Sequence, residues 1–128
     1  MIKNFATLLN CMDGRVQLPA INWIKANFNV EYVDTITEPG IDRLVYEKDM
    51  DFLNSLNRKI NISLSLHTSK YIFITGHHDC SGNSASKEEH MKHIKCSVKL
   101  LKDIYKNIPV TGLWINQNFE VEKVYTIE

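Results

Sequence analysis

The sequence predicts an α/β fold, in which a mainly parallel central sheet is covered by helices on both faces. Short apolar segments alternate along the chain with segments whose apolar residues recur at helical spacing. This alternation is typical of parallel strands joined by helical crossovers. Polar turns follow the first and third apolar segments, and a 2-1-3-4 strand order would bring those turns together. The predicted architecture is three-layered, with that order and an antiparallel strand at the C-terminal edge.

Length and composition limit the classes of protein to which the chain can belong. Its 128 residues suit a single domain, residues 1–128, that can build a core without disulfides. Lys plus Arg and Asp plus Glu are both 15, so nothing indicates nucleic-acid binding. No apolar run is long enough to span a membrane, and the N-terminus lacks a signal core. The 3 cysteines cannot all pair, so we expect a cytoplasmic protein with reduced thiols.

The first half of the chain reads as two strands with a helix between them. Residues 5–9 are mostly apolar and end at turn residues, as a buried parallel strand does. Pro19 begins a helix, because proline is tolerated in a first helical turn. Residues 30–36 are rich in β-forming side chains and predict the second strand. Pro39 and Gly40 end it.

The second half predicts two longer helices and three strands. Leucine and isoleucine recur at helical spacing over 49–67, and residues 71–75 form the clearest buried strand. Ser86 and Glu89 fit a capping box at the start of a long helix. Alternation over 120–127, after a fourth strand at 109–115, predicts a closing hairpin.

Two turns carry the residues with metal-binding chemistry. Cys11 follows the first predicted strand, whereas His77 and Cys80 follow the third. Zinc favours thiolate and imidazole ligands in tetrahedral geometry, and three protein ligands leave one position open, as in catalytic sites. Water in that position has a pKa of about 7 and supplies hydroxide at neutral pH. We therefore expect one zinc ion per chain, held by Cys11, His77 and Cys80.

Asp13 and Arg15 lie beside the first cysteine and predict a carboxylate–guanidinium dyad. Paired with Arg15, Asp13 stays ionised and can accept a hydrogen bond from the water on zinc. Unpaired, Asp13 could occupy the fourth position and close the site. We expect Met12, between Cys11 and Asp13, to serve in packing.

The two turns together resemble the motifs of the β-class carbonic anhydrases. Residues 11–15, C-M-D-G-R, are similar to that family's C-x-D-x-R, and residues 76–80, G-H-H-D-C, are similar to its G-H-x-x-C. Residues 16–21 and 110–124 also match. The resemblance implies the family's fold, zinc on Cys11, His77 and Cys80, and an Asp13–Arg15 dyad. It also implies reversible hydration of carbon dioxide, a small-molecule substrate, and a homodimer or higher homo-oligomer.

The chain departs from the family pattern beside the second cysteine and after the second strand. Ser81 replaces a usual glycine, and residues 37–40, T-E-P-G, replace R-N-A-G and introduce Glu38. The chain also has almost nothing before its first strand. These departures leave two alternatives open. One is a zinc hydrolase acting on carbonyl sulfide or carbon disulfide, and the other is a zinc-binding protein without turnover.

The remaining polar and sulfur-containing residues have simpler interpretations. We expect His78 to point away from the metal and Asp79 to cap the turn. Cys96 is expected in the core. His90 and His93 share a helix, where we expect them to be solvated.

Overall fold

The computed structural model describes residues 3–128, which form one five-stranded sheet in the order β2-β1-β3-β4-β5. The pairs β1–β2, β1–β3 and β3–β4 are parallel, whereas β4 and β5 are antiparallel. The predicted fold class, strand order and edge hairpin are therefore confirmed. In chain order the elements are β1 (Phe5–Asn10), η1 (Gly14–Val16), α1 (Gln17–Asn27), β2 (Tyr32–Thr37), α2 (Ile41–Glu47), α3 (Met50–Asn61), the π-helical turn η2 (Ile62–Leu66), β3 (Ile72–His77), α4 (Lys87–Ile104), β4 (Val110–Ile115) and β5 (Val121–Ile127).

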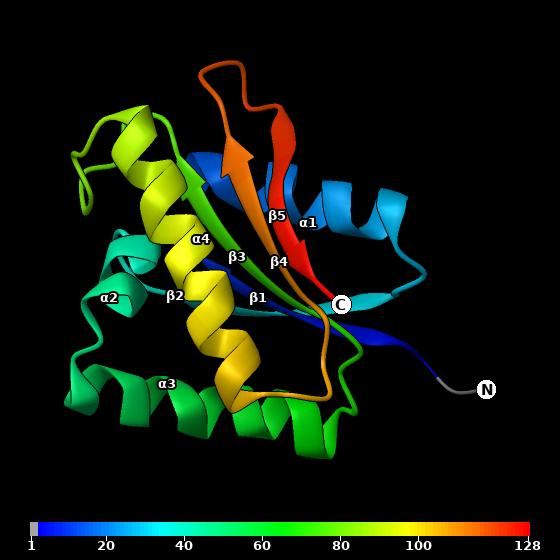
Figure 1. The fold of residues 1–128 in the computed structure, drawn as a ribbon. Helices are drawn as coiled ribbons and strands as arrows, with labels where there is room; N and C mark the ends of the chain where they lie inside the picture. Colours follow the sequence, from blue (N-terminus) through cyan, green and yellow to red (C-terminus); the bar gives the residue numbers. More distant parts are fainter. Residues whose placement is uncertain (1–2) are drawn as a thin grey trace.

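Helices cover both faces of the sheet (Figure 1). On one face α1 contributes Ala20 and Ile24 to a core that includes Leu8 and Phe73. The opposite face carries α2, α3 and α4 over a second core that includes Ile74. Within residues 3–128 no helix has both the length and the apolar character needed to cross a bilayer.

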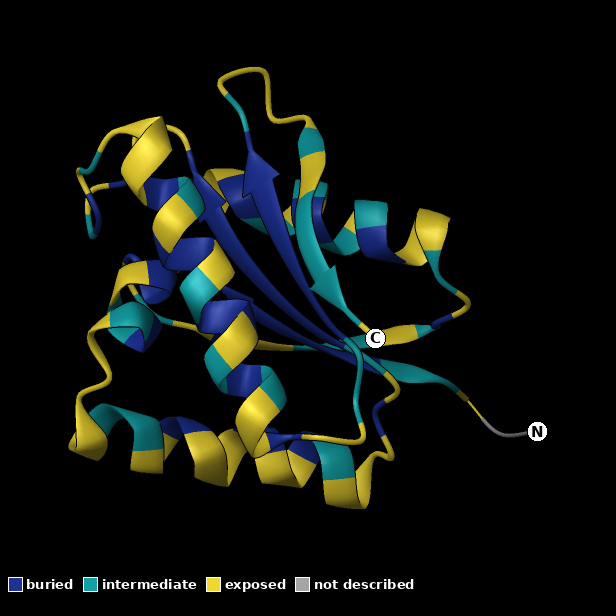
Figure 2. Cartoon of the chain, viewed as in Figure 1, coloured by how far each residue is buried: buried dark blue, intermediate teal, exposed yellow. Residues whose placement is uncertain are grey.

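Burial is most complete in the strands at the centre of the sheet. Every residue of β3 and β4 is buried, whereas most of β5 is only half-buried (Figure 2). Strands covered on both faces are expected to be apolar throughout rather than alternating. This explains why residues 71–75 gave a clear signal in the sequence.

The sheet has its switch point between β1 and β3. The chain leaves β1 for β2 on one side, then returns through α2 and α3 to β3 on the other side. Leu9 of β1 lies opposite Ile74 of β3, so the carboxyl ends of these strands are neighbours. Ligands of open α/β sheets bind at such a place. Cys11 and His77 both reach it.

The sequence patterns missed one short helix, α2. Its seven residues lie between Gly40 and Lys48, which both have left-handed backbone conformations, with φ of 61° and 58°. A helix this short offers too few repeats for its periodicity to be detected. The helix expected over 49–67 is present as α3 and η2, and Asp49 caps it by accepting from the N–H of Phe52.

The long helix α4 begins where the capping residues predicted. The Ser86 side chain accepts a hydrogen bond from the Glu89 N–H. The expectation that His90 and His93 are solvated is wrong, because they are only 2% and 7% exposed. His90 lies four residues before Ile94 and so on the same helical face, which packs inward. Cys96 is half-buried rather than in the core.

At Gly112 the helix α4 packs closely on the sheet. A Cβ atom there would lie 2.3 Å from Ile94 Cγ2 and 3.0 Å from Val98 Cγ2. Both side chains belong to the buried face of α4. The absence of a side chain at Gly112 thus sets how near the helix can pack.

Replacing Gly112 with alanine should lower the free energy of unfolding by about 1–3 kcal/mol, because overpacking forces the helix or its side chains to shift. Urea unfolding followed by circular dichroism measures this loss. Gly14→Ala is the control, since no atom lies within 4 Å of a Cβ atom there. Equal losses in the two variants would contradict the packing argument.

Candidate metal centre

The turn after β1 is held in place by two amide side chains, those of the buried Asn10 and the half-buried Gln17. Thr75 of β3 donates to Asn10 Oδ1 at 2.6 Å, which joins the ends of the two central strands. Gln17 Nε2 donates to the carbonyl oxygens of Cys11, at 2.7 Å, and Asp13, at 2.8 Å. These bonds satisfy carbonyls that no strand partner reaches. They also set the direction in which Cys11 leaves the sheet.

The turn after β3 reverses the chain over a short distance. The N–H of His78 donates to the Ile115 carbonyl at 2.9 Å, which continues the pairing with β4. Asp79 then adopts a left-handed conformation, with φ of 56°, so that Cys80 turns back over the sheet. Gly82 makes this turn compact, because a Cβ atom on it would lie 2.5 Å from the Gly40 nitrogen.

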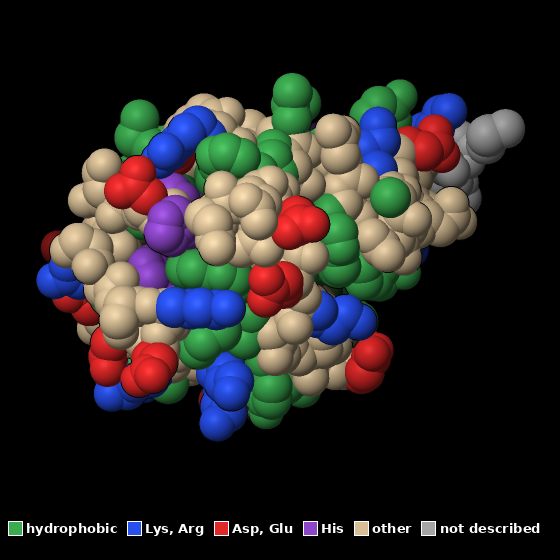
Figure 3. All heavy atoms as spheres, turned by 90° about the horizontal axis from the view of Figure 1, so that it is seen from above, with side chains coloured by type: hydrophobic (Ala, Val, Ile, Leu, Met, Phe, Trp, Pro, Cys, Tyr) green, Lys and Arg blue, Asp and Glu red, His purple; other side chains and the backbone are tan. Residues whose placement is uncertain are grey.

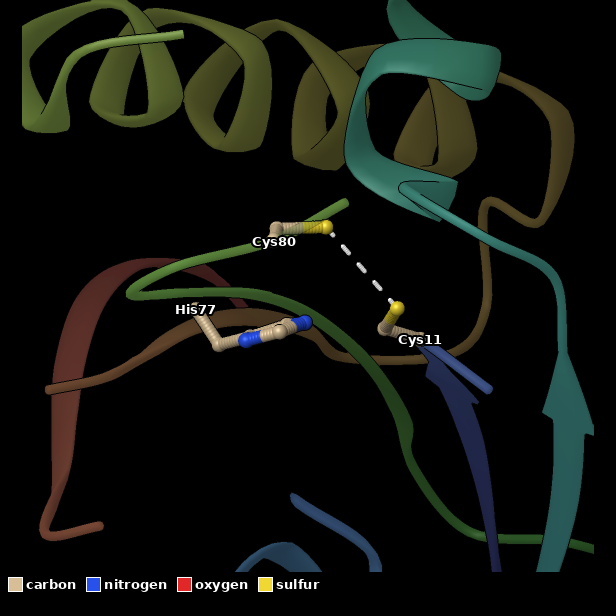
Figure 4. Close-up of side chains that lie close together, drawn as sticks. All are labelled: Cys11, His77 and Cys80. Atoms are coloured by element: carbon tan, nitrogen blue, oxygen red, sulfur yellow. Dashed lines mark hydrogen bonds between the residues drawn. The ribbon is translucent and has the colours of Figure 1, made fainter. Parts of the chain in front are cut away.

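The two turns bring Cys11, His77 and Cys80 together. Their ligand atoms all lie within 4.8 Å of one another, and all three side chains are buried. The two sulfur atoms are 3.8 Å apart, and the His77 ring points toward them (Figure 4). Among the residues described, this is the one such group of potential metal ligands. A soft cation such as zinc suits two thiolates and an imidazole.

The imidazole of His77 has one satisfied and one unsatisfied nitrogen. Nδ1 lies 2.9 Å from the His78 carbonyl oxygen and donates to it, so in the neutral ring Nε2 carries the lone pair. Nε2 is the one buried side-chain nitrogen or oxygen in residues 3–128 that lacks a hydrogen-bond partner. Buried polar atoms rarely stay unpaired. A histidine ligand whose other N–H donates to a carbonyl has this arrangement in metal sites.

The two thiols share a proton. The Cys80 S–H donates to the Cys11 sulfur, 3.8 Å away. This bond, the nearby His77 ring and the backbone N–H groups of Gly40 and Asp13 together lower the pKa of Cys11 to about 4. The Cys11 thiolate raises the pKa of Cys80 in turn. A metal cation would replace this shared proton and hold both cysteines as thiolates.

Asp13 and Arg15 form the expected ion pair at the edge of the group. Arg15 Nη2 lies 2.7 Å from Asp13 Oδ2, and Arg15 Nε lies 3.1 Å from Asp13 Oδ1. These bonds lower the pKa of Asp13 to about 2. Arg15 also contacts Asp79, through a 3.3 Å ion pair and a 3.2 Å bond to its carbonyl, and so connects the two turns. The Asp13 carboxylate is outside the group of ligand atoms.

The residues beside the metal group differ in how well they match expectation. Met12 is 61% exposed, so its predicted packing role is wrong within the chain. His78 is exposed, as expected for a side chain that points away from the metal, and Ser81 is exposed as well. The Glu38 carboxylate lies 3.9 Å from Lys59 on α3, and no described contact links it to the cysteines. The charge introduced at position 38 is thus neutralised outside the metal group.

Sequence reasoning missed the polar residues that support the two turns. Asn10 and Gln17 hold the first turn, and Asn83 follows the second. The available signal was an asparagine at the end of an apolar strand, where a buried amide is unusual.

A cavity of about 350 Å³ lies elsewhere in the molecule and involves no residue of the metal group. Its lining residues are Asp34, Thr35, Ile36, Thr37, Lys59, Ile62, Ser63 and His67.

Comparisons with known proteins agree with the fold. The family described as "Putative carbonic anhydrase" matches residues 1–125. Among solved structures, a carbonic anhydrase from Glaciozyma antarctica superposes with a TM-score of 0.61 at 18% identity, covering 94% of this chain and 81% of that one. Structures of two tetrameric β-carbonic anhydrases from Sordaria macrospora include one with a TM-score of 0.59 at 12% identity, covering 98% and 84%. Comparison with curated proteins finds no match.

At these identities the solved structures establish the fold, which is that of the β-carbonic anhydrases. The family match extends over nearly the whole chain and includes both cysteine-bearing turns. The chain therefore belongs to this carbonic anhydrase family.

Proposed function

We propose that this protein is a zinc-dependent lyase that catalyses the reversible hydration of carbon dioxide to bicarbonate. The observation that carries the proposal is the buried, unpartnered His77 Nε2 beside two thiols that share a proton. Membership of a carbonic anhydrase family supports the reaction. The fold supports it through the position of the group at the switch point of the sheet.

The ligands of the proposed zinc are Cys11 Sγ, His77 Nε2 and Cys80 Sγ, with one ion per chain. Bound zinc supplies Lewis acidity, which lowers the pKa of water and makes a nucleophile available at neutral pH. Three protein ligands leave one coordination position for exchange with solvent and reactant. The bond from His77 Nδ1 to the His78 carbonyl orients the ring for this role.

Asp13 acts in the proposed mechanism as a hydrogen-bond acceptor rather than as a base. A carboxyl group whose pKa is about 2 holds a proton too weakly to remove one efficiently at neutral pH. Its charge can still orient a donor hydroxyl near the open coordination position. Arg15 keeps the carboxylate ionised by donating to both of its oxygens.

A second candidate keeps the zinc but changes the substrate to carbonyl sulfide or carbon disulfide. The observation that favours it is the sequence at 37–40, which differs from the family pattern beside the site. The pairing of Glu38 with Lys59 weakens this candidate, because the carboxylate is neutralised away from the sulfur atoms. A zinc-binding protein without turnover is the third candidate. Assays with each substrate separate the three.

The proposal includes a homodimer or a larger homo-oligomer. Met12 and Leu18, in and just after the first turn, are 61% and 67% exposed, and a second copy would cover them.

The surface near the proposed site is mixed in character. At the end of the molecule toward which β3 and β4 run, histidine side chains reach the surface among apolar and charged side chains (Figure 3).

The proposed compartment is the cytoplasm, because reduced thiols persist there.

The first test compares two cysteine variants. Cys11→Ala should abolish zinc binding and reduce carbon dioxide hydration to the uncatalysed rate, because it removes one of the three ligands. Cys96→Ala is the matched control, since Cys96 lies on α4 outside the group. Metal analysis and stopped-flow hydration assays measure both. Wild-type protein with zinc bound but no hydration faster than Cys11→Ala would refute the proposed reaction.

Arg15→Gln should slow hydration by about tenfold or more near neutral pH, because the released Asp13 carboxylate can move toward the open coordination position. Arg43→Gln is the control. Arg43 is also ion-paired, with Glu47, and its side chain is 51% exposed against 49% for Arg15. Unchanged rates in both variants would contradict the role given to the Asp13–Arg15 pair.

Zinc binding should release the proton of Cys80 and any proton on His77, whose pKa the neighbouring Cys11 raises, because Cys11 is already a thiolate near neutral pH. The affinity should fall as the pH is lowered, since protons then compete more strongly for the sulfur atoms. Calorimetric titration in buffers of different ionisation enthalpy measures the release. A binding enthalpy independent of the buffer would contradict this assignment of the proton.

A further inference from the structure

A second cluster of polar side chains lies buried behind the metal group. Its members are Asp42 of α2, Asn83 of the loop after Cys80, and His90 and His93 of α4. They are only 1%, 1%, 2% and 7% exposed. The proposed reaction uses none of them. Burying such groups is costly unless they are hydrogen-bonded to one another, so their arrangement needs an explanation.

The cluster is closely connected by hydrogen bonds. His90 Nδ1 lies 2.6 Å from Asp42 Oδ2, and His90 Nε2 donates to the Asn83 carbonyl at 3.0 Å. A proton must lie on each ring nitrogen or be shared with Asp42, because both partners of the ring are acceptors. The Asn83 amide donates to Asp42 Oδ1 at 3.1 Å and lies 3.0 Å from His93 Nδ1. The side chains thus hold one another in a single arrangement.

Asn83 connects this cluster to Cys80. Its side chain binds Asp42, while its backbone N–H and that of Gly82 face the Cys80 sulfur. The Asn83 carbonyl is in turn fixed by His90. The peptide groups that approach the Cys80 sulfur are therefore held by side chains of two helices.

Asp42 makes the equivalent connection to Cys11. It lies two residues after Gly40, whose backbone N–H faces the Cys11 sulfur. Gly40 packs directly on Gly82, since a Cβ atom on Gly40 would lie 2.5 Å from the Gly82 carbonyl carbon. The Asp42–Asn83 bond therefore joins the two loops close to this contact. A Cβ atom on Gly76, just before His77, would lie 2.6 Å from Asp42 Oδ2.

We infer that Asp42, Asn83 and His90 are positioning residues for the metal centre, which act by fixing the two loops that face the cysteine sulfurs. The inference rests on the proposed zinc site. Supporting residues behind metal ligands typically change metal affinity 10- to 100-fold when they are replaced. Hydrogen bonding rather than net charge carries this role. An asparagine at position 42 could accept from Asn83 and donate to the neutral His90 ring.

The test measures zinc affinity by competition with a chromogenic chelator. Asp42→Ala should weaken zinc binding by about 10- to 100-fold, whereas Asp42→Asn should stay within a few-fold of the wild type. The absorption bands of the Co²⁺-loaded protein should change in Asp42→Ala and be restored in Asp42→Asn. Val98→Ala is the control. Val98 is a buried residue of α4, but its side chain packs against Gly112 of β4 rather than against the polar cluster. It should lower stability without changing zinc affinity.

The outcomes separate this inference from the proposed function. Wild-type protein that binds no zinc would overturn both. Zinc binding that is equal in wild type and Asp42→Ala, or equally weakened in Val98→Ala, would overturn the inference alone. If Asp42→Ala does not fold, Asn83→Ser takes its place, since it removes the bonds to Asp42 and His93. An unchanged affinity and Co²⁺ spectrum in Asn83→Ser would then overturn it.

Discussion

The parallel pairing of β1 with β3 is the constraint on which the rest of the molecule depends. These strands are distant in sequence, and Leu9 opposite Ile74 places their carboxyl ends side by side. Cys11 and His77 therefore leave the sheet at neighbouring points, and a turn with a left-handed residue returns Cys80 to them. The packing of α1 on one face and α4 on the other holds this pairing in register.

The polar groups at the carboxyl ends of β1 and β3 lower the stability of the fold unless a ligand binds them. Two thiols that share a proton and an imidazole nitrogen without a partner would destabilise a core that served only for packing. The neighbouring Asp42–His90 pair is buried as well, but its polar atoms are paired. The Asp42–His90 cluster is thus fully hydrogen-bonded without a ligand, whereas a cation would supply the interactions that the cysteine–histidine group lacks. This contrast is the physical basis for treating the first as support and the second as the site.

Sequence reasoning was most successful where a pattern was local or long. The buried strand near 71–75, the Ser86 cap and the closing hairpin all follow from short-range chemistry and are present. It failed for α2, which is too short to show a period, and for His90, whose polarity suggested solvent. His90 is buried because its helical face packs inward and Asp42, far away in sequence, provides a partner.

The sequence alone determined the fold class and the residues with metal-binding chemistry, because hydrophobic periodicity and turn composition are properties of neighbouring residues. It favoured the strand order only through the requirement that the two cysteine-bearing turns meet. Only the tertiary structure decided which of these residues meet. It brought Cys11 within 3.8 Å of Cys80, turned Asp13 toward Arg15, and joined Asp42 to Asn83 behind both cysteines. These contacts link segments that are far apart in the chain or depend on side-chain direction. Spacing along a sequence specifies neither of these, because strand register and helix packing set them.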